Sequence, residues 1–291
     1  TKPSPNGLSS PSLLDTNRDG KADYAYAGDI DGNLWKFDLK SSSANAWKVA
    51  YDGAPLHPKT GKQAITQAPQ IALHPRYGYM IYFATGRLYT TGDLTDTSIQ
   101  SLYGIWDSGK TPPANQSLLK QTWDGPKTYD YRDKDNNAAN QTIAIYNPDA
   151  GNANWDTHHG WKVDFPAGGY RVLQPVQVRA NRVKATVYKP TVGQQGENWL
   201  VEAVLTDGGP NPPAAPIYDL NVDRQLKEDD LYTMEGDADA KVPMMWRQVD
   251  GIMSQVTIGA TASGIDTLFI NYVQPSVPSE PCTEKCPAGF F

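Results

Sequence analysis

Short segments in which polar and apolar residues alternate constrain the fold of this chain most strongly. The clearest is 176–188, VQVRANRVKATVY, in which valine or alanine alternates with a polar residue in 176–179 and again in 183–187. Successive side chains of a strand point to opposite faces, so each half is predicted to be a strand with one buried face. The pair Ala180 and Asn181 between them is predicted to be a hairpin turn.

Comparable segments recur along the chain. The predicted strands are 24–27, 34–39, 45–51, 70–73, 79–84, 101–107, 160–166, 176–179, 182–188, 197–205, 217–223 and several within 251–273. Asp31-Gly32 is a strong two-residue hairpin signal between the first two. The polar stretch 108–160 lacks the pattern and is predicted to form surface excursions. With 25 Gly and 23 Pro, and no apolar stripe at helical spacing, the chain is predicted to be all-β.

Several predicted strands carry a tryptophan and run into an aspartate or a turn. The segments are DGNLWKFDL (31–39), SLYGIWD (101–107) and ENWLVEAVLTDGG (197–209). One such unit cannot bury both of its faces, so the units must stack, and radial stacking gives a β-propeller. The predicted architecture is a modified β-propeller, with a β-sandwich as the alternative.

The composition divides the chain into three parts. Residues 1–14 are polar and rich in Pro and Ser, which is typical of a linker within a longer protein; 15–275 form the predicted propeller; and 276–291 form a tail. The tail contains Cys282 and Cys286, whose proximity predicts a small disulfide. Two free thiols, or half of a metal site, are the alternatives.

The overall charge argues against one class of partner. The formal net charge is -6, whereas a nucleic-acid backbone favours a basic face. The sequence has neither a signal-peptide pattern nor an apolar run of about 18 residues that would span a membrane.

An acidic segment beside the first predicted strand has the spacing of a calcium loop. The segment DTNRDGKAD has oxygen ligands at alternate positions and Gly20 at its sixth position, and the predicted ligands are Asp15, Asn17, Asp19, Lys21 (through its carbonyl) and Asp23. Calcium takes about six to eight oxygen ligands, which alternate residues of a tight loop can supply. The twelfth position is Tyr26 rather than a bidentate Glu, so Asp23 and water must complete the shell.

Other acidic groups have simpler interpretations. A solvated acidic turn is the alternative for the loop itself, and magnesium is the less suitable ion because it prefers a rigid octahedron. Asp29 and Asp31 are interpreted as hairpin-turn residues. The segments 133–137 and 219–223 also have alternate oxygens, but neither has Gly at its sixth position, so turns are predicted there.

Four segments resemble the PilC/PilY family of type IV pilus-associated adhesins. They are 15–39, 78–107, 160–190 and 197–209, which occur in the family's order and together span 15–209, most of the chain. The resemblance implies the C-terminal modified β-propeller of a large secreted protein, of which this chain holds the whole ring or only the later blades. It also implies the calcium ligands given above.

The resemblance carries functional implications as well. Calcium in the loop would be tied to pilus extension and retraction, and so to twitching motility and surface attachment. The implied partners are pilus subunits or minor pilins and a receptor on a host or abiotic surface, and the implied location is the bacterial cell surface, on the pilus or at the outer membrane. Some members carry an Arg-Gly-Asp integrin motif, but Arg18-Asp19-Gly20 has the wrong order.

Three other functions compete with a pilus adhesin. A quinoprotein-like enzyme is suggested by DGNLWKFDL, but adjacent cysteines are absent. A hydrolase would have to use His158 and His159, around which no acidic group has metal-ligand spacing. A glycan-binding propeller module with exposed tyrosines overlaps with adhesion. The chain is therefore predicted to be a calcium-binding adhesin module and not an enzyme.

Overall fold

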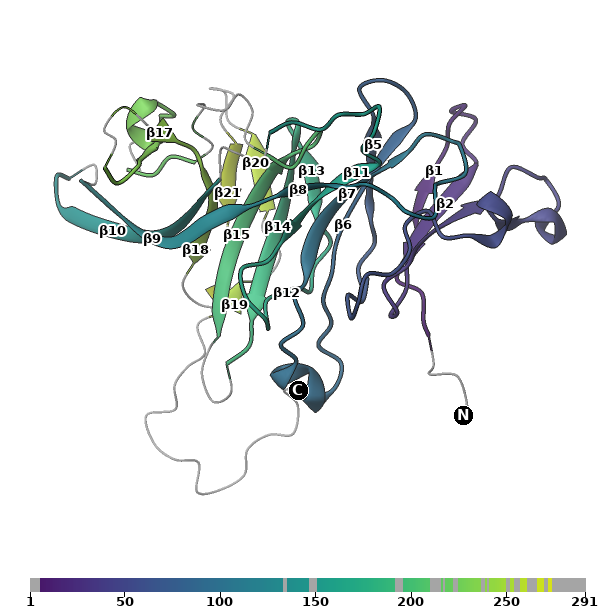
Figure 1. Cartoon of the computed structure of the whole chain (residues 1–291), viewed down its shortest axis with the longest axis horizontal. Coiled ribbons are helices and arrows are strands. Elements are labelled where there is room, and N and C mark those ends of the chain that lie inside the picture. Colours follow the sequence, from purple (N-terminus) through teal and green to yellow (C-terminus); the bar gives the residue numbers. More distant parts are fainter. Residues whose placement is uncertain are drawn as a thin grey trace.

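The described chain consists of β-strands and short 3-10 helices. The computed structural model (Figure 1) describes residues 6–132, 135–146, 151–191, 196–209, 216, 218–221, 225–236, 239 and 241–249, and the backbone of β19 (Ile252–Met253), β20 (Thr257–Ala260), β21 (Asp266–Phe269) and β22 (Tyr272–Val273). The predicted all-β class is confirmed. No helix in these ranges is long and apolar enough to cross a membrane. Cys282 and Cys286 lie outside the described residues, so their disulfide stays a prediction.

The first sheet is an antiparallel meander of four strands. Its order is β1 (Ser12–Leu14), β2 (Tyr24–Gly28), β3 (Leu34–Asp38) and β4 (Lys48–Val49). The predicted hairpin turn lies between β2 and β3, where the Gly32 amide donates to the Asp29 carbonyl at 3.0 Å. The predicted third strand is reduced to β4, flanked by the 3-10 helices η1 (Ala44–Ala46) and η2 (Tyr51–Gly53).

The prediction that 1–14 is a linker is wrong for its last residues. Ser12 to Leu14 form β1, which pairs with β2 in register from Ser12 opposite Tyr26 to Leu14 opposite Tyr24. Leu14 is half-buried and packs against the core of the first and second sheets. A strand of three residues is too short to show an alternating pattern in a polar segment.

The second sheet has five strands. Their order is β5 (Gln70–Leu73), β6 (Tyr79–Ala84), β7 (Ser101–Asp107), β11 (Gly160–Asp164) and β8 (Leu119–Gln121). All neighbours are antiparallel except β11 and β8, which are parallel. The strands predicted at 70–73, 79–84 and 101–107 are confirmed, and the strand predicted at 160–166 is confirmed except that it ends at Asp164. The 3-10 helix η3 (Thr91–Thr95) lies in the connection from β6 to β7.

The third sheet is the largest. Its order is β12 (Arg171–Val172), β14 (Arg182–Lys189), β15 (Glu197–Val204), β18 (Met244–Val249), β10 (Ala138–Tyr146) and β9 (Trp123–Arg132), and β13 (Gln177–Arg179) also pairs with β14. The predicted turn between β13 and β14 is confirmed, because Ala180 and Asn181 have φ of 48° and 61°. A short pair, β16 (Tyr232–Thr233) and β17 (Lys241–Val242), lies nearby with the 3-10 helix η5 (Glu228–Asp230).

Two predictions about this part of the chain are wrong. Residues 108–160 are not merely surface excursions, since β9 and β10 form a long hairpin that joins the third sheet through β18 and projects from it in Figure 1. β9 exposes every second residue and is therefore polar overall. The strand predicted at 217–223 is absent from residues 218–221, where the Leu220 amide donates to the Asp230 carboxylate at 2.7 Å instead of to a strand.

The three sheets pack face to face in series, with the second sheet in the middle (Figure 1). On β6, Ile81 and Phe83 pack against Tyr26 and Leu34 of the first sheet. Residues at alternate positions of β6 pack against the third sheet, in a cluster that includes Met80, Tyr82, Val183, Val187, Trp199 and Trp246. Three sheets in series are the packing of propeller blades, and a two-sheet sandwich does not describe them. The described sheets do not close into a ring.

Candidate functional site

The predicted calcium loop is the nine-residue connection between β1 and β2. Two of its residues, Arg18 and Gly20, have positive φ of 63° and 84°. The left-handed conformation at Gly20 is one that glycine adopts without strain. The chain therefore turns sharply where the sequence pattern requires it to turn.

Side-chain oxygens hold this loop through its own backbone amides. The two carboxylate oxygens of Asp15 accept hydrogen bonds from the amides of Arg18 at 2.6 Å and Gly20 at 2.8 Å. Asn17 Oδ1 accepts from the Asp19 amide at 2.8 Å, and Asp19 Oδ1 accepts from the Lys21 amide at 2.9 Å. These short-range bonds turn the side chains of alternate residues toward the inside of the loop.

Asp23 lies at the base of the hairpin rather than at its tip. Its Oδ2 accepts hydrogen bonds from the hydroxyl of Thr16 and, at 2.8 Å, from the Thr16 amide. These bonds, the hydroxyl first, lower the pKa of Asp23. The Asp23 amide donates to the Leu14 carbonyl at 2.8 Å, and its carbonyl accepts from the Leu39 amide at 2.9 Å. Asp23 therefore ties the loop to β1 and to the end of β3.

The donor set of this loop suits a hard cation by its chemistry. Asp15, Asn17, Asp19 and Asp23 can each supply an oxygen ligand, and three of them supply carboxylates. Tyr26, at the twelfth position, is fully buried and donates its hydroxyl to Asp107, so it faces away from the loop. Over the described ranges, no group of three or more His, Cys, Asp or Glu side chains is placed to hold a metal ion. The ligand set thus rests on the sequence pattern and the turn geometry.

Asp29 has the turn role that the sequence predicts. It is buried, and its carboxylate accepts hydrogen bonds from the Asn33 amide at 2.8 Å, and from the side chains of Asn33, Trp35 and Asn6 at 2.8, 2.7 and 3.0 Å. Burial acts to raise the pKa of Asp29, but these hydrogen bonds outweigh it and hold the pKa below its ordinary value. Asp31, in the same turn, pairs with Lys59 at 3.8 Å.

The other segments that the sequence analysis considered provide no further site. Asp133 and Asp223 lie outside the described residues. His158 Nδ1 accepts a hydrogen bond from the Asn154 amide at 2.9 Å, in the loop before β11. The His159 backbone connects that loop to Trp106 and Ser117 at 2.9 and 2.8 Å. Neither His residue belongs to a metal-binding group among the residues that the structure describes.

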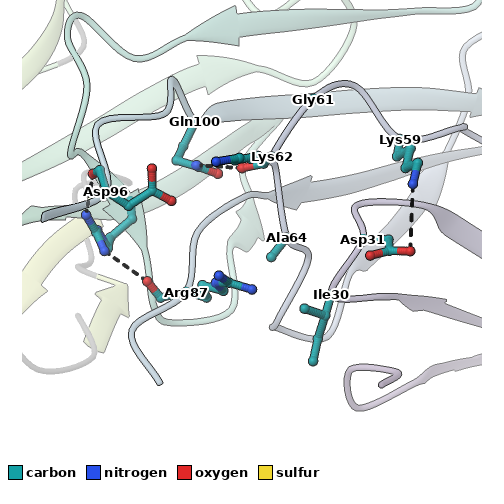
Figure 2. Close-up of a pocket in the computed structure, with 10 residues that line it drawn as sticks. Ile30, Asp31, Lys59, Gly61, Lys62, Ala64, Arg87, Asp96 and Gln100 are labelled. Atoms are coloured by element: carbon teal, nitrogen blue, oxygen red, sulfur yellow. Dashed lines mark hydrogen bonds and ion pairs between the residues drawn. The ribbon is translucent and has the colours of Figure 1, made fainter. Parts of the chain in front are cut away.

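A polar cavity that sequence reasoning missed lies between the β2–β3 turn and the η3 region. Its volume is about 350 Å³, and its lining residues are Ile30, Asp31, Lys59, Gly61, Lys62, Ala64, Arg87, Asp96, Gln100 and Arg171. Figure 2 shows Asp96 and Gln100 on one side, Lys59 and Asp31 on the other, and Lys62 between them. These residues are spread over 142 positions and share no motif, so no local signal could have found them.

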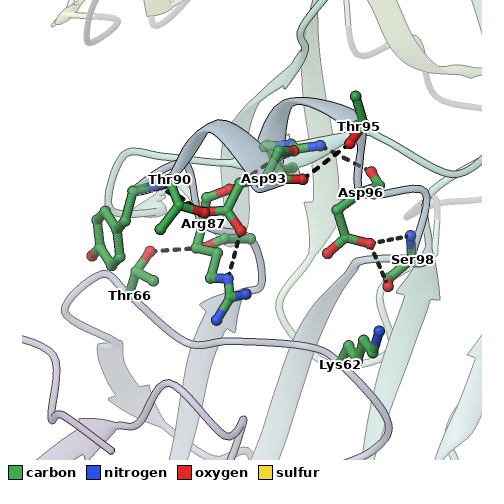
Figure 3. Close-up of polar contacts among 12 residues, drawn as sticks. Lys62, Thr66, Arg87, Thr90, Asp93, Thr95, Asp96 and Ser98 are labelled. Carbon is green, nitrogen blue, oxygen red and sulfur yellow. Dashed lines mark hydrogen bonds and ion pairs between the residues drawn. The ribbon is translucent and has the colours of Figure 1, made fainter. Parts of the chain in front are cut away.

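A buried arginine, Arg171, fixes one wall of this cavity by binding the η3 region, whose Asp93 and Asp96 are shown in Figure 3. Arg171, of β12, donates to the carbonyls of Gly169 and Arg87 at 3.0 Å and of Asp96 at 3.1 Å, and also to that of Asp93. Asp93 caps η3 by accepting from the amides of Tyr89 and Thr90, both at 2.9 Å. The third sheet thus holds the η3 loop of the second sheet in place.

Stacked antiparallel sheets with an acidic loop on the first hairpin define this chain as a β-propeller-type domain whose described sheets remain open. The family profile described as the PilY1 beta-propeller domain matches residues 1–140. The crystal structure of the Pseudomonas aeruginosa PilY1 C-terminal domain superimposes with a TM-score of 0.76 at 28% identity, covering 93% of this chain and 60% of that one.

Relatives with curated names give the same result. The type IV pilus biogenesis factor PilY1 of Pseudomonas aeruginosa is 37% identical over 204 residues, which are 57% of this chain and 17% of the relative. A PilY1 homolog of Xylella fastidiosa is 32% identical over 227 residues, 70% of this chain and 14% of the relative. The chain belongs to the PilY1 family, and it matches less than a fifth of the length of these two relatives.

Proposed function

We propose that this chain is a non-catalytic, calcium-binding module of a type IV pilus-associated adhesin and biogenesis factor. Calcium in the β1–β2 loop would regulate pilus extension and retraction, and with them twitching motility and surface attachment. The module would act at the bacterial cell surface, where it would bind pilus subunits or minor pilins and a surface receptor. The name of the Pseudomonas aeruginosa relative, type IV pilus biogenesis factor, supports the pilus part of this proposal.

The observation that carries the calcium part is the arrangement of oxygens in one short hairpin loop. Residues 15, 17, 19 and 23 supply side-chain oxygens, and the turn at Gly20 leaves the Lys21 carbonyl available as a further ligand. Regulation further requires that a pilus partner bind the calcium-loaded and calcium-free loop with different affinity, since equal affinity would shift neither state.

Calorimetric titration with calcium tests the binding step. We expect saturable binding by the wild type, and a loss on the order of tenfold or more in Asp19→Ala and Asp23→Ala, because each removes a carboxylate. The larger loss is expected for Asp23→Ala, since no Glu at the twelfth position can compensate. Asp31→Ala is the matched control, because Asp31 is an exposed acidic residue in the turn at the other end of β2.

A second control distinguishes the loss of a calcium ligand from the loss of a hydrogen bond within the loop. Asp23 also accepts hydrogen bonds from the Thr16 hydroxyl and the Thr16 amide, so Asp23→Ala removes a ligand and both of these bonds. Thr16→Val removes only the bond from the hydroxyl and is expected to retain calcium binding. The calcium proposal fails if the wild type binds no calcium at millimolar concentration, or if Asp31→Ala weakens binding as much as Asp19→Ala.

The regulatory step is tested with the same alleles in the full-length protein. Twitching and surface attachment are expected to fall in Asp23→Ala. Asp19→Lys places a positive charge in the loop and is expected to mimic the calcium-bound state. Asp19→Ala adds no charge and is expected to behave like the calcium-free loop. If Asp23→Ala abolishes calcium binding while motility and attachment stay unchanged, calcium binding is not regulatory.

A further inference from the structure

The cavity beside η3 has a local charge opposite in sign to that of the whole chain. Four cationic side chains line it, those of Lys59, Lys62, Arg87 and Arg171, against the two carboxylates of Asp31 and Asp96, whereas the chain carries a net charge of -6. Cations gathered in a concave site attract an anion by raising its local concentration. The charge balance therefore points to an anionic ligand.

Three of these four cationic side chains already have an ion-pair or hydrogen-bond partner, so the fourth is the most available to a ligand. Arg171 is used by backbone carbonyls, Arg87 Nε pairs with Asp93 at 2.8 Å, and Lys59 pairs with Asp31 at 3.8 Å. Lys62 is exposed and forms no ion pair with a carboxylate of the described chain; Asp96 is close enough only for their charges to interact. The Lys62 ammonium is thus the strongest candidate to bind an anionic group.

A buried amide oxygen in the same cavity lacks a hydrogen-bond donor. Gln100 is 6% exposed, and its Nε2 donates to the Lys62 carbonyl at 3.0 Å and to no carboxylate. That bond fixes which end of the amide is oxygen, because a carbonyl can accept only from nitrogen. Gln100 Oε1 accepts no hydrogen bond from any described residue. A buried acceptor without a donor is costly, so a ligand that brings a donor gains by binding here.

The other residues that line the cavity restrict the chemical class of the ligand. Asp31 and Asp96 add carboxylates, which repel a multiply charged anion such as phosphate but accept hydrogen bonds from the hydroxyl groups of a singly charged ligand. None of the lining residues is aromatic, so the stacking that a neutral sugar gains on an aromatic ring is missing. A volume of about 350 Å³ is at the small end of ligand pockets. We propose that the cavity binds a hydroxylated carboxylate the size of one uronic acid residue, with its carboxylate on Lys62 and a hydroxyl on Gln100 Oε1.

This site is separate from the calcium loop. The loop precedes β2 and the β2–β3 turn that contributes Ile30 and Asp31 follows it, so the five residues of β2 separate the two. Uronates also bind calcium, and the two effects must be told apart. Titrations with a chelator present remove any contribution from the loop.

Saturation-transfer NMR titration in chelator tests the proposal. The probes are sodium D-glucuronate, D-glucose and inorganic phosphate, and a galacturonic acid trimer represents an acidic polysaccharide. We expect saturable glucuronate binding, with glucose and phosphate at least about tenfold weaker. A trimer that binds more tightly than the monomer indicates a polysaccharide as the source of the ligand, and a weaker one indicates a free hydroxy acid.

Single substitutions test whether glucuronate binds in this cavity. Lys62→Gln and Gln100→Met are expected to weaken glucuronate binding at least about tenfold, and Lys110→Gln, at an exposed lysine outside the cavity, is expected to leave it unchanged. Lys62→Gln alters an exposed side chain, so it keeps the test valid if Gln100→Met folds poorly. Absence of saturable glucuronate binding, equal binding of phosphate, or an equal effect of Lys110→Gln would overturn the proposal.

Discussion

One buried ion pair joins the first sheet to the second, and breaking it should cost the domain much of its stability. Lys36 of β3 and Asp107 at the end of β7 have side chains only 6% and 1% exposed, with Nζ 2.7 Å from Oδ2. The hydroxyls of Tyr26 and Tyr51 also donate to the Asp107 carboxylate, and Lys36 Nζ lies 4.0 Å from the centre of the Tyr24 ring. The proposed perturbation is Lys36→Met, which keeps the length of the side chain and removes its charge.

The size of the effect follows from this geometry. At 2.7 Å and an effective dielectric constant near 20, the attraction between the two charges is about 6 kcal/mol, against which the cost of desolvating both must be set. Removing one partner leaves the other charged and buried, which typically costs about 3–5 kcal/mol. A domain has about 5–15 kcal/mol of unfolding free energy in total, so Lys36→Met should be among the most damaging single changes.

Urea unfolding followed by tryptophan fluorescence measures this loss. The double variant Lys36→Met, Asp107→Asn removes both charges and leaves an amide oxygen for the two tyrosines, so it should lose less than Lys36→Met alone. Lys48→Met, at an exposed residue of β4, is the control and should change stability by no more than about 0.5 kcal/mol. A loss below about 1 kcal/mol in Lys36→Met, or a double variant at least as unstable as Lys36→Met alone, would refute the reasoning.

Two further predictions concern packing and acid stability. Gly104→Ala should cost about 3 kcal/mol, because its Cβ would lie 2.5 Å from the buried Trp161 ring, whereas Gly20→Ala, with φ of +84° and open space, should cost only about 1 kcal/mol. Urea midpoints compare the two, and equal losses would contradict this packing argument. The pKa values of Asp29 and Asp107 are lowered in the folded state, although burial acts to raise both, because hydrogen bonds at Asp29 and Lys36 beside Asp107 outweigh it. Their contribution to stability is therefore present above the ordinary carboxyl pKa of about 3.9 and is lost as the pH falls through the lower folded values, so unfolding free energy should decline below about pH 4. Asp29→Asn should flatten that decline in urea titrations over a pH series, and an unchanged decline would argue against Asp29 as a source.

The elements that could be predicted from the sequence are those whose pattern lies within a few consecutive residues. The strands at 79–84 and 101–107 are rich in apolar and aromatic residues, and the β13–β14 hairpin alternates between polar and apolar around a two-residue turn. The pattern of the proposed calcium loop is also local, because nine consecutive residues contain it, but calcium binding there stays a prediction. Features of this kind can be read without knowledge of the tertiary structure.

What was missed depends on contacts between distant parts of the chain. β9 is polar because one of its faces is open to solvent, and only its pairing with β10 makes it a strand. β18 lies between β15 and β10, although about 40 and 100 residues separate it from them along the chain. The cavity combines residues from 30 to 171, and its most informative member, Gln100, is distinguished only by a buried oxygen without a donor.

The antiparallel pairing of β1 with β2 has a mechanical consequence. The strands share only three residue pairs, and the nine-residue loop follows β1 directly. Tension on the chain ahead of β1 would first load the contacts of Leu8 and Ser9 with Asp29 and Gly28. It would then load the bond from the Ser12 hydroxyl to the Pro69 carbonyl and the three pairs in turn, from Ser12 to Leu14. Once the three pairs had opened, the pull would reach Asp15 and then the bond between Thr16 and Asp23. The loop and the first strand thus bear force in series, and the loop is the next element to be stretched when that strand peels away.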